Sequence, residues 1–276
     1  MVDAGVTSFL AAGHTGEFYS LSLTEWEATV GTIRGAVGPR GHTFAAVGHD
    51  VRTACEMASI SRGLGCCGTV IQQPPHPTIG AAGYLYYVAE IVQASGLPTV
   101  LYLTASPVAE AVASRISSVD GVIGVKWGIP DIDAFVRVSQ QTPDGPAGGI
   151  TWVCGLGERW AQRFFDCGVT GYTSGLVNVH PSLVLRYHAA LLARDQTAVA
   201  SMWPSISRFE SLRLIDGGAV TVIKSALSRR GQCESTVRPP LSAPDASVLE
   251  AIDELLQRWD DEECDGAISP STESIR

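Results

Sequence analysis

A lysine ends a short apolar run of the sequence, because Lys126 follows directly on Val122–Val125. If this run is a strand of a parallel α/β barrel, its carboxyl end opens onto the face where such barrels carry their active sites. Partial removal from water at that position lowers the pKa of an amine and leaves more of the neutral form, which attacks carbonyl carbons. The alternative is a lysine that extends its ammonium group from the strand end into water.

A tyrosine lies in the preceding apolar run, where Tyr102 belongs to Thr99–Leu103. Beside a lysine imine, its phenol could relay protons to and from the reacting atoms. Tyrosine is also common in strands for packing reasons alone, so the structural explanation stays open.

Polar residues follow the first and the last of the apolar runs. The loop Gly13–Glu17 offers backbone N–H groups and a hydroxyl to a carboxylate, through His14, Thr15 and Gly16. The segment Gly171–Gly175 places Thr173 and Ser174 at the same rim. Each segment by itself is equally consistent with an ordinary turn.

Other patterns predict structure rather than chemistry. Gly63–Gly68 matches a dinucleotide fingerprint but follows a helix and precedes a strand, the reverse of the required order, so we interpret it as a helix end. His42, His49 and Asp50 lack a third ligand at a metal-binding spacing, and we expect loop or capping roles and no metal site. Lys224 lies on a predicted helix and is interpreted as structural.

Short apolar runs alternate with amphipathic stretches, which predicts a parallel sheet covered by helices. The predicted strands are Val6–Ala11, Thr43–Val47, Gly68–Gln72, Thr99–Leu103, Val122–Val125, Ile150–Val153 and Gly171–Thr173. The predicted helices are Thr24–Val37 with a threonine cap, Val51–Leu64, Ala81–Ser95, Pro107–Ser117, Asp131–Gln141, Glu158–Cys167 and Pro181–Arg194. So many strand–helix units indicate a (β/α)8 barrel of the TIM type.

The barrel is expected to lack its first strand–helix unit, because Asp3–Val6 reads as the end of a helix that leads into a strand. We therefore predict a barrel over residues 1–195 and a helical extension over 196–259. The acidic and Ser-rich segment 260–276 is expected to be disordered.

Composition restricts the partners and the compartment. The net charge of -9 disfavours nucleic acid and anionic membrane surfaces, and we expect neither as a partner. The irregular spacing of seven cysteines favours free thiols in a reducing cytoplasm over a disulfide framework.

The rim residues together resemble the dihydrodipicolinate synthase / N-acetylneuraminate lyase family of class I aldolases. Gly13–Glu17, Tyr102 and Ile123–Lys126 carry this resemblance, in that order along the chain. Within the family, Gly16–Leu21, Gly168–Ser174 and Val237–Leu241 resemble the 5-dehydro-4-deoxyglucarate dehydratase branch.

The resemblance implies a mechanism without metal or organic cofactor. Lys126 would form a Schiff base with the ketone of a 2-keto acid, Thr15 and its loop would hold the carboxylate, and Tyr102 would move protons. Ser174 would lie near the departing hydroxyl or a water. In this branch the substrate would lose water and carbon dioxide to give 2,5-dioxopentanoate. The resemblance also implies a homo-oligomer, a tetramer or a dimer.

Two alternatives remain open: a pyruvate-dependent aldolase or synthase on the same scaffold, and a catalytically inactive paralogue. The second alternative is suggested by departures from the family pattern at the rim. His14 and Trp127 are two such departures, and Trp127 is expected to narrow the pocket. The segment Gln72–Pro77 also lacks the tyrosine that some members lend to a neighbouring subunit.

Overall fold

The computed structural model describes residues 1–76, 78–104, 106–113, 115–142, 149–215 and 218–267. The chain divides into two compact units, Met1–Val199 and Ala200–Arg276. The larger unit contains every strand of the described residues and all the rim residues discussed above.

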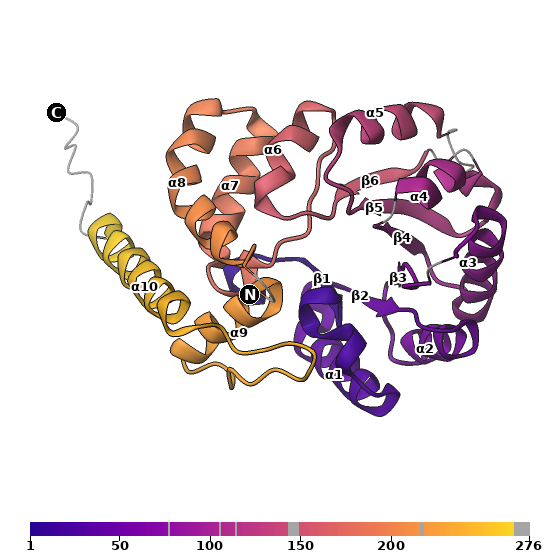
Figure 1. The fold of residues 1–276 in the computed structure, drawn as a ribbon, viewed down its shortest axis with the longest axis horizontal. Helices are drawn as coiled ribbons and strands as arrows, with labels where there is room; N and C mark the ends of the chain where they lie inside the picture. Colours follow the sequence, from indigo (N-terminus) through magenta and orange to yellow (C-terminus); the bar gives the residue numbers. More distant parts are fainter. Residues whose placement is uncertain (77, 105, 114, 143–148, 216–217, 268–276) are drawn as a thin grey trace. The chain divides into compact units, whose positions relative to one another are not determined.

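Six parallel strands form one sheet in chain order, β1 to β6, and curve into a half-barrel with helices along its outer side (Figure 1). The strands are β1 Ser8–Ala11, β2 His42–Val47, β3 Gly68–Gln72, β4 Thr99–Leu103, β5 Val122–Trp127 and β6 Thr151–Cys154. They confirm six of the predicted strands. The seventh predicted run contributes only an isolated parallel bridge between Cys154 and Tyr172. The absence of a first strand–helix unit stays a prediction.

The helices of the larger unit begin and end within a few residues of their predicted bounds. They are α1 Leu23–Val37, α2 Val51–Gly63, α3 Ala81–Ser95, α4 Ser106–Ala113, α5 Ile132–Gln141, α6 Glu158–Asp166, α7 Pro181–Ala193 and the start of α8 Gln196–Leu212. The predicted threonine cap of the first helix is wrong. Ser22 is the N-cap, because its hydroxyl accepts from the Glu25 N–H while the Glu25 carboxylate accepts from the Ser22 N–H.

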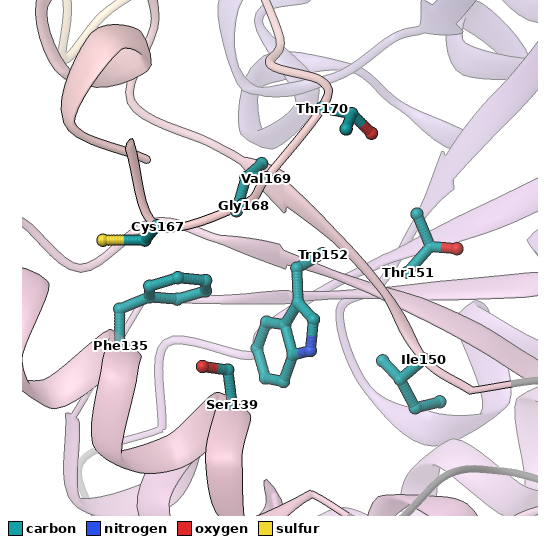
Figure 2. Close-up of a pocket in the computed structure, with 9 residues that line it drawn as sticks. All are labelled: Phe135, Ser139, Ile150, Thr151, Trp152, Cys167, Gly168, Val169 and Thr170. Carbon is teal, nitrogen blue, oxygen red and sulfur yellow. The ribbon is translucent and has the colours of Figure 1, made fainter. Parts of the chain in front are cut away.

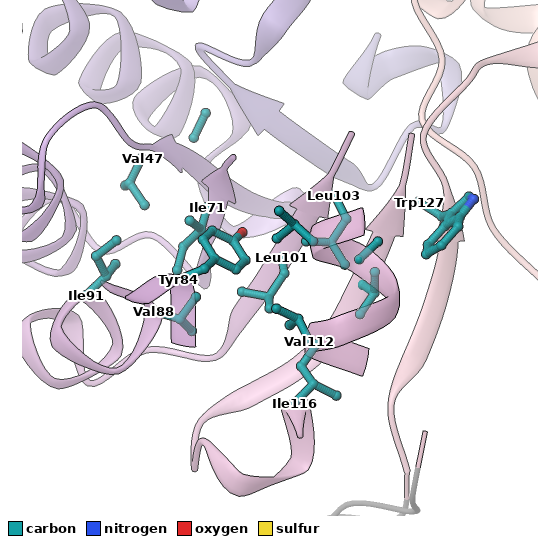
Figure 3. Close-up of a cluster of buried hydrophobic side chains, with 14 of the residues drawn as sticks. Val47, Ile71, Tyr84, Val88, Ile91, Leu101, Leu103, Val112, Ile116 and Trp127 are labelled. Atoms are coloured by element: carbon teal, nitrogen blue, oxygen red, sulfur yellow. The ribbon is translucent and has the colours of Figure 1, made fainter. Parts of the chain in front are cut away.

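The register of the sheet decides which side chains face the barrel interior. Tyr102 of β4 pairs with Lys126 of β5, and Lys126 pairs with Val153 of β6. Paired residues in neighbouring strands point to the same face, so these three side chains lie together. The intervening residues point outward and pack against the helices, among them Ile71, Leu101, Leu103 and Trp127 (Figure 3).

The outward-facing cluster is the main source of cohesion in the larger unit. Ile71, Leu101 and Leu103 are fully buried, and α3 adds Tyr84, Val88 and Ile91 (Figure 3). Burial of each large apolar side chain contributes about 1.5–3 kcal/mol. The strand ends that carry the polar rim residues therefore project from a tightly packed support.

The smaller unit is helical, as predicted, and contains the rest of α8 with α9 Gly218–Arg229 and α10 Ala246–Ala267. Buried Trp259 of α10 donates to the Ser205 hydroxyl, and Arg229 pairs with Asp253 at 2.7 Å. Lys224 donates to a backbone carbonyl oxygen, consistent with its structural interpretation.

The predicted disordered tail begins too early. Helix α10 continues through Asp260 to Ala267, and residues 268–276 lie outside the described residues. Asp260 pairs with Arg230 at 3.0 Å, and Asp261 accepts from Gln257 one turn earlier. These partners stabilise the acidic residues within the helix.

Candidate active site

Lys126 occupies a buried position in the barrel interior at the carboxyl end of β5. Its side chain is 7% exposed, and Nζ lies 4.0 Å from the centroid of the Tyr102 ring. Burial lowers the pKa of this amine to about 8, and the neighbouring Cys154 partly opposes the change. Near neutral pH, Lys126 therefore has a larger neutral fraction than an ordinary lysine, and the neutral amine is the form that attacks a carbonyl.

Tyr102 lies beside this amine on the adjacent strand. Burial raises the pKa of its phenol, and the nearby Tyr19 and Cys154 raise it further. The phenol therefore keeps its proton at neutral pH and is able to donate it. The sequence-based pairing of Lys126 with Tyr102 is realised in the register of β4 and β5.

Two glycines make room for this pair. A Cβ atom at Gly128 would lie 2.6 Å from Tyr102 Cε2. A Cβ atom at Gly155 would lie 2.9 Å from Tyr102 Cε2 and 3.0 Å from Lys126 Cγ. Only glycine permits these close approaches, which fix the amine and the phenol against each other.

The loop after β1 forms two 3-10 turns, His14–Gly16 and Phe18–Ser20. The Gly16 N–H donates to the Gly13 carbonyl oxygen at 2.8 Å, so the turn itself uses this backbone donor. The Thr15 side chain is half-buried and His14 is exposed. The expectation that this loop receives a carboxylate therefore depends on Thr15 and His14 more than on the Gly16 amide.

The rim segment after the seventh run is tied to β6 and α6. The Thr173 N–H donates to the Cys154 carbonyl oxygen at 2.9 Å. Ser174 accepts from the Val177 N–H at 2.8 Å and donates its own hydroxyl to Glu158. A fully buried carboxylate thus stands behind the serine at the rim.

A model of the dihydrodipicolinate synthetase family matches residues 1–258 of this sequence. The chain belongs to that family. The curated relatives include the probable 5-dehydro-4-deoxyglucarate dehydratase 1 of Streptomyces avermitilis, which is 29% identical over 93% of this chain and 84% of its own length. The probable 5-dehydro-4-deoxyglucarate dehydratase of Rhodococcus opacus is 30% identical over 91% of this chain and 84% of its own.

Solved structures of the family share the fold. The crystal structure of dihydrodipicolinate synthase from Bacillus clausii has a TM-score of 0.88 and 31% identity, over 94% of this chain and 88% of that one. The enzyme from Oceanobacillus iheyensis also gives 0.88, at 29% identity, over 94% and 87%. This chain is accordingly a lyase of the dihydrodipicolinate synthetase family with a β/α-barrel fold.

The expectation that Trp127 narrows the pocket beside Lys126 is wrong. Its side chain is fully buried and packs edge-on against Phe135 of α5 and Trp152 of β6. Side chains alternate along a strand, so the neighbour of an inward-facing lysine faces outward. Trp127 supports the strand from behind and does not narrow the pocket.

Sequence reasoning missed Glu158, a fully buried carboxylate near the rim. It follows Gly157 as the first residue of α6, where an acidic residue is easily explained by the helix dipole. Both Glu158 and Lys126 contribute to the shifted pKa of the Cys154 thiol. The only available signal in the sequence was an acid at the first position of a predicted helix.

A shallow pocket of about 310 Å³ lies away from this site (Figure 2). It is lined by Phe135 and Ser139 of α5, the start of β6 around Trp152, and residues 167–170. The pocket therefore lies at the amino end of β6, whereas Lys126 lies at the carboxyl end of β5. Because the active sites of such barrels lie at the carboxyl ends of the strands, this pocket is not the catalytic one.

The residues considered as possible metal ligands are distributed along β2 and the start of α2. His42 begins β2 whereas His49 follows its other end, and Asp50 caps α2 by accepting from the N–H groups of Arg52 and Thr53. Within the described residues, no three His, Cys, Asp or Glu side chains gather as a metal site. Likewise, none of the helices described is both long and apolar enough to cross a membrane.

Proposed function

We propose that this lyase forms an imine between Lys126 and a 2-keto acid and converts 5-dehydro-4-deoxyglucarate to 2,5-dioxopentanoate. The observation that carries the proposal is the buried Lys126, whose pKa is lowered to about 8, beside the protonated Tyr102 at the barrel mouth. The names of the curated relatives support the choice of substrate.

The reaction begins when the neutral amine attacks the keto carbon, C2 of the 2-keto acid. Tyr102 donates a proton to the carbonyl oxygen, which leaves as water when the imine forms. Thr15 and His14 hold the adjacent carboxylate from the loop after β1. The protonated imine then withdraws electrons from C3 and acidifies its hydrogens.

The imine serves as electron acceptor for both later steps. Loss of a C3 proton expels the C4 hydroxyl as water, and we assign the proton exchange with that leaving group to Ser174, which donates its hydroxyl to Glu158. The electrons of the C5–C6 bond then flow through the new double bond into the imine as carbon dioxide departs. Protonation and hydrolysis release 2,5-dioxopentanoate and regenerate the amine, for a net loss of one water and one carbon dioxide.

The pyruvate-dependent aldolase or synthase is the second candidate. The synthase of Bacillus clausii favours it, because its identity to this chain is similar to that of the dehydratases. Both candidates require the imine at Lys126, and they differ in the acid consumed. We also expect the lyase to assemble as a homo-oligomer, which sedimentation analysis would measure.

The test is product analysis of the purified protein. With 5-dehydro-4-deoxyglucarate we expect equal amounts of carbon dioxide and 2,5-dioxopentanoate, and no product from Lys126→Ala. Consumption of pyruvate with an aldehyde, and none of the six-carbon diacid, would favour the aldolase. Turnover that persists in Lys126→Ala would rule out the imine mechanism.

A further inference from the structure

Backbone strain is concentrated at the rim around β1 and β2. Among the described residues, three of the four non-glycine residues with positive φ follow these two strands: Ala12 at 50°, Glu17 at 58° and His49 at 74°. A side chain in the left-handed region costs conformational free energy, and such strain clusters at functional sites. The structure thus holds the His49 imidazole in place at the expense of an unfavourable backbone.

The contacts of His49 fix its ring and its backbone. The imidazole stacks on the buried Phe18 ring, with centroids 4.6 Å apart and planes 9° from parallel. The Tyr87 phenol donates to the His49 carbonyl oxygen at 3.2 Å. One face of the imidazole is covered by Phe18, and no hydrogen bond to its ring nitrogens is found within the part of the chain that the structure describes.

Tyr19 contacts the imidazole of His49 from the loop after β1. Its ring meets the rings of His49 and His14 edge-on, at centroid distances of 6.0 and 6.1 Å. Tyr19 also contributes to the raised pKa of the Tyr102 phenol. Tyr19 thus contacts the imidazoles of the loops after β1 and after β2, and these loops follow the carboxyl ends of two neighbouring strands.

We propose that His49, together with Tyr19, binds the second carboxylate of a dicarboxylic keto acid, at the end remote from Lys126. This inference rests on the proposed function and names the side chains that would select a diacid. Three strand spacings separate β2 from β5, about 14 Å along the sheet. The inward-pointing lysine side chain and a six-carbon diacid together span such a distance.

The charges around His49 agree with this role. Burial lowers the pKa of its imidazole, and Asp50 opposes that change. The Asp50 carboxylate is occupied at the first turn of α2, where it accepts from Arg52, Thr53 and the Thr53 hydroxyl. A neutral imidazole orients a carboxylate without strongly stabilising its charge, which suits a group that must leave as carbon dioxide.

A matched pair of ligands tests the inference. 2-Oxoadipate and 2-oxohexanoate have the same six-carbon chain and keto acid end, and only 2-oxoadipate has a carboxylate at the other end. We would measure the concentration of each that half-saturates borohydride trapping, and its affinity by calorimetry, which needs no imine. The variant is His49→Asn, because asparagine tolerates a positive φ. The control is His42→Asn, at the opposite end of the same strand.

The wild-type lyase is expected to prefer the diacid by about ten-fold or more, as for a charge-assisted hydrogen bond. His49→Asn should abolish most of that preference, and His42→Asn should retain it. No preference in the wild-type protein, or an undiminished preference in His49→Asn, would overturn the inference while the imine itself stands. Absence of trapping with both acids would instead refute the imine, and the calorimetric preference would still decide the role of His49.

Discussion

The pKa of Lys126 controls both reactivity and stability. Burial lowers it from 10.5 to about 8 in the folded protein. The rate of imine formation with pyruvate should therefore rise with pH and level off above about 8. Reduction with borohydride after timed incubations between pH 6 and 10.5 would measure the rate of imine formation at each pH. A midpoint near the ordinary lysine value of 10.5 would contradict the burial of this amine.

The same burial makes Lys126 costly for folding. Between pH 8 and 10.5 the unfolded chain binds more protons than the folded one, so the contribution of Lys126 to stability improves as pH rises through that window. Below it the penalty is fully present. Lys126→Met should raise the free energy of unfolding at pH 7 by up to about 3 kcal/mol and abolish trapping. Chemical denaturation of both proteins at pH 7 and at pH 10 would measure this gain in unfolding free energy and show whether it declines as pH rises.

The Tyr102 hydroxyl is expected to accelerate proton transfer and to contribute little to the stability of the fold. The Tyr102 ring packs against Lys126 and near Gly128 and Gly155, and the hydroxyl adds the proton donor. Tyr102→Phe keeps the ring, so we expect turnover to fall about 100-fold or more with little change in thermal stability. Unchanged turnover would remove Tyr102 from the mechanism.

At the scale of elements, Gly155 allows a close approach between the carboxyl ends of β5 and β6. A Cβ atom at Gly155 would meet Tyr102, Lys126 and the Trp127 carbonyl oxygen within 3.0 Å. Gly155→Ala should destabilise the fold by about 1–3 kcal/mol and reduce trapping by displacing the lysine. Gly83→Ala on α3, where nothing lies within 4 Å, is the matched control and should be neutral or slightly stabilising. Equal behaviour of the two variants would contradict the close approach.

The strands and helices were predictable because apolar periodicity is local information. The pairing of Tyr102 with Lys126 followed from placing both at strand ends. Two errors had physical causes. Trp127 was assigned to the pocket although alternation along the strand places it opposite Lys126. Thr24 was preferred as a cap although Ser22 forms the reciprocal pair with Glu25.

Contacts that join distant segments were not predictable. The hydrogen bond between Ser174 and the buried Glu158, and the stack of His49 on Phe18, join residues from different segments of the chain. No spacing rule in the sequence signals either contact. His49 was expected to have a loop or capping role and no metal, and its positive φ is visible only in three dimensions.

For the whole molecule, family membership determines the fold and the class of enzyme, while the rim determines the substrate. Residues 1–258 match the family, and the chain covers 84% of the length of the dehydratases from Streptomyces avermitilis and Rhodococcus opacus. The synthase of Bacillus clausii, at 31% identity, is about as distant from this chain in sequence as the probable dehydratase of Streptomyces avermitilis, at 29%. The imine at Lys126 is the claim on which every proposed reaction depends.

The most direct test of that claim is to trap the imine and locate it. The protein is incubated with 5-dehydro-4-deoxyglucarate or pyruvate, reduced with borohydride and digested for peptide mass analysis. The account predicts a reduced adduct on the peptide containing Lys126, and none in Lys126→Ala. An adduct on another lysine, or none on folded protein with either acid, would contradict it.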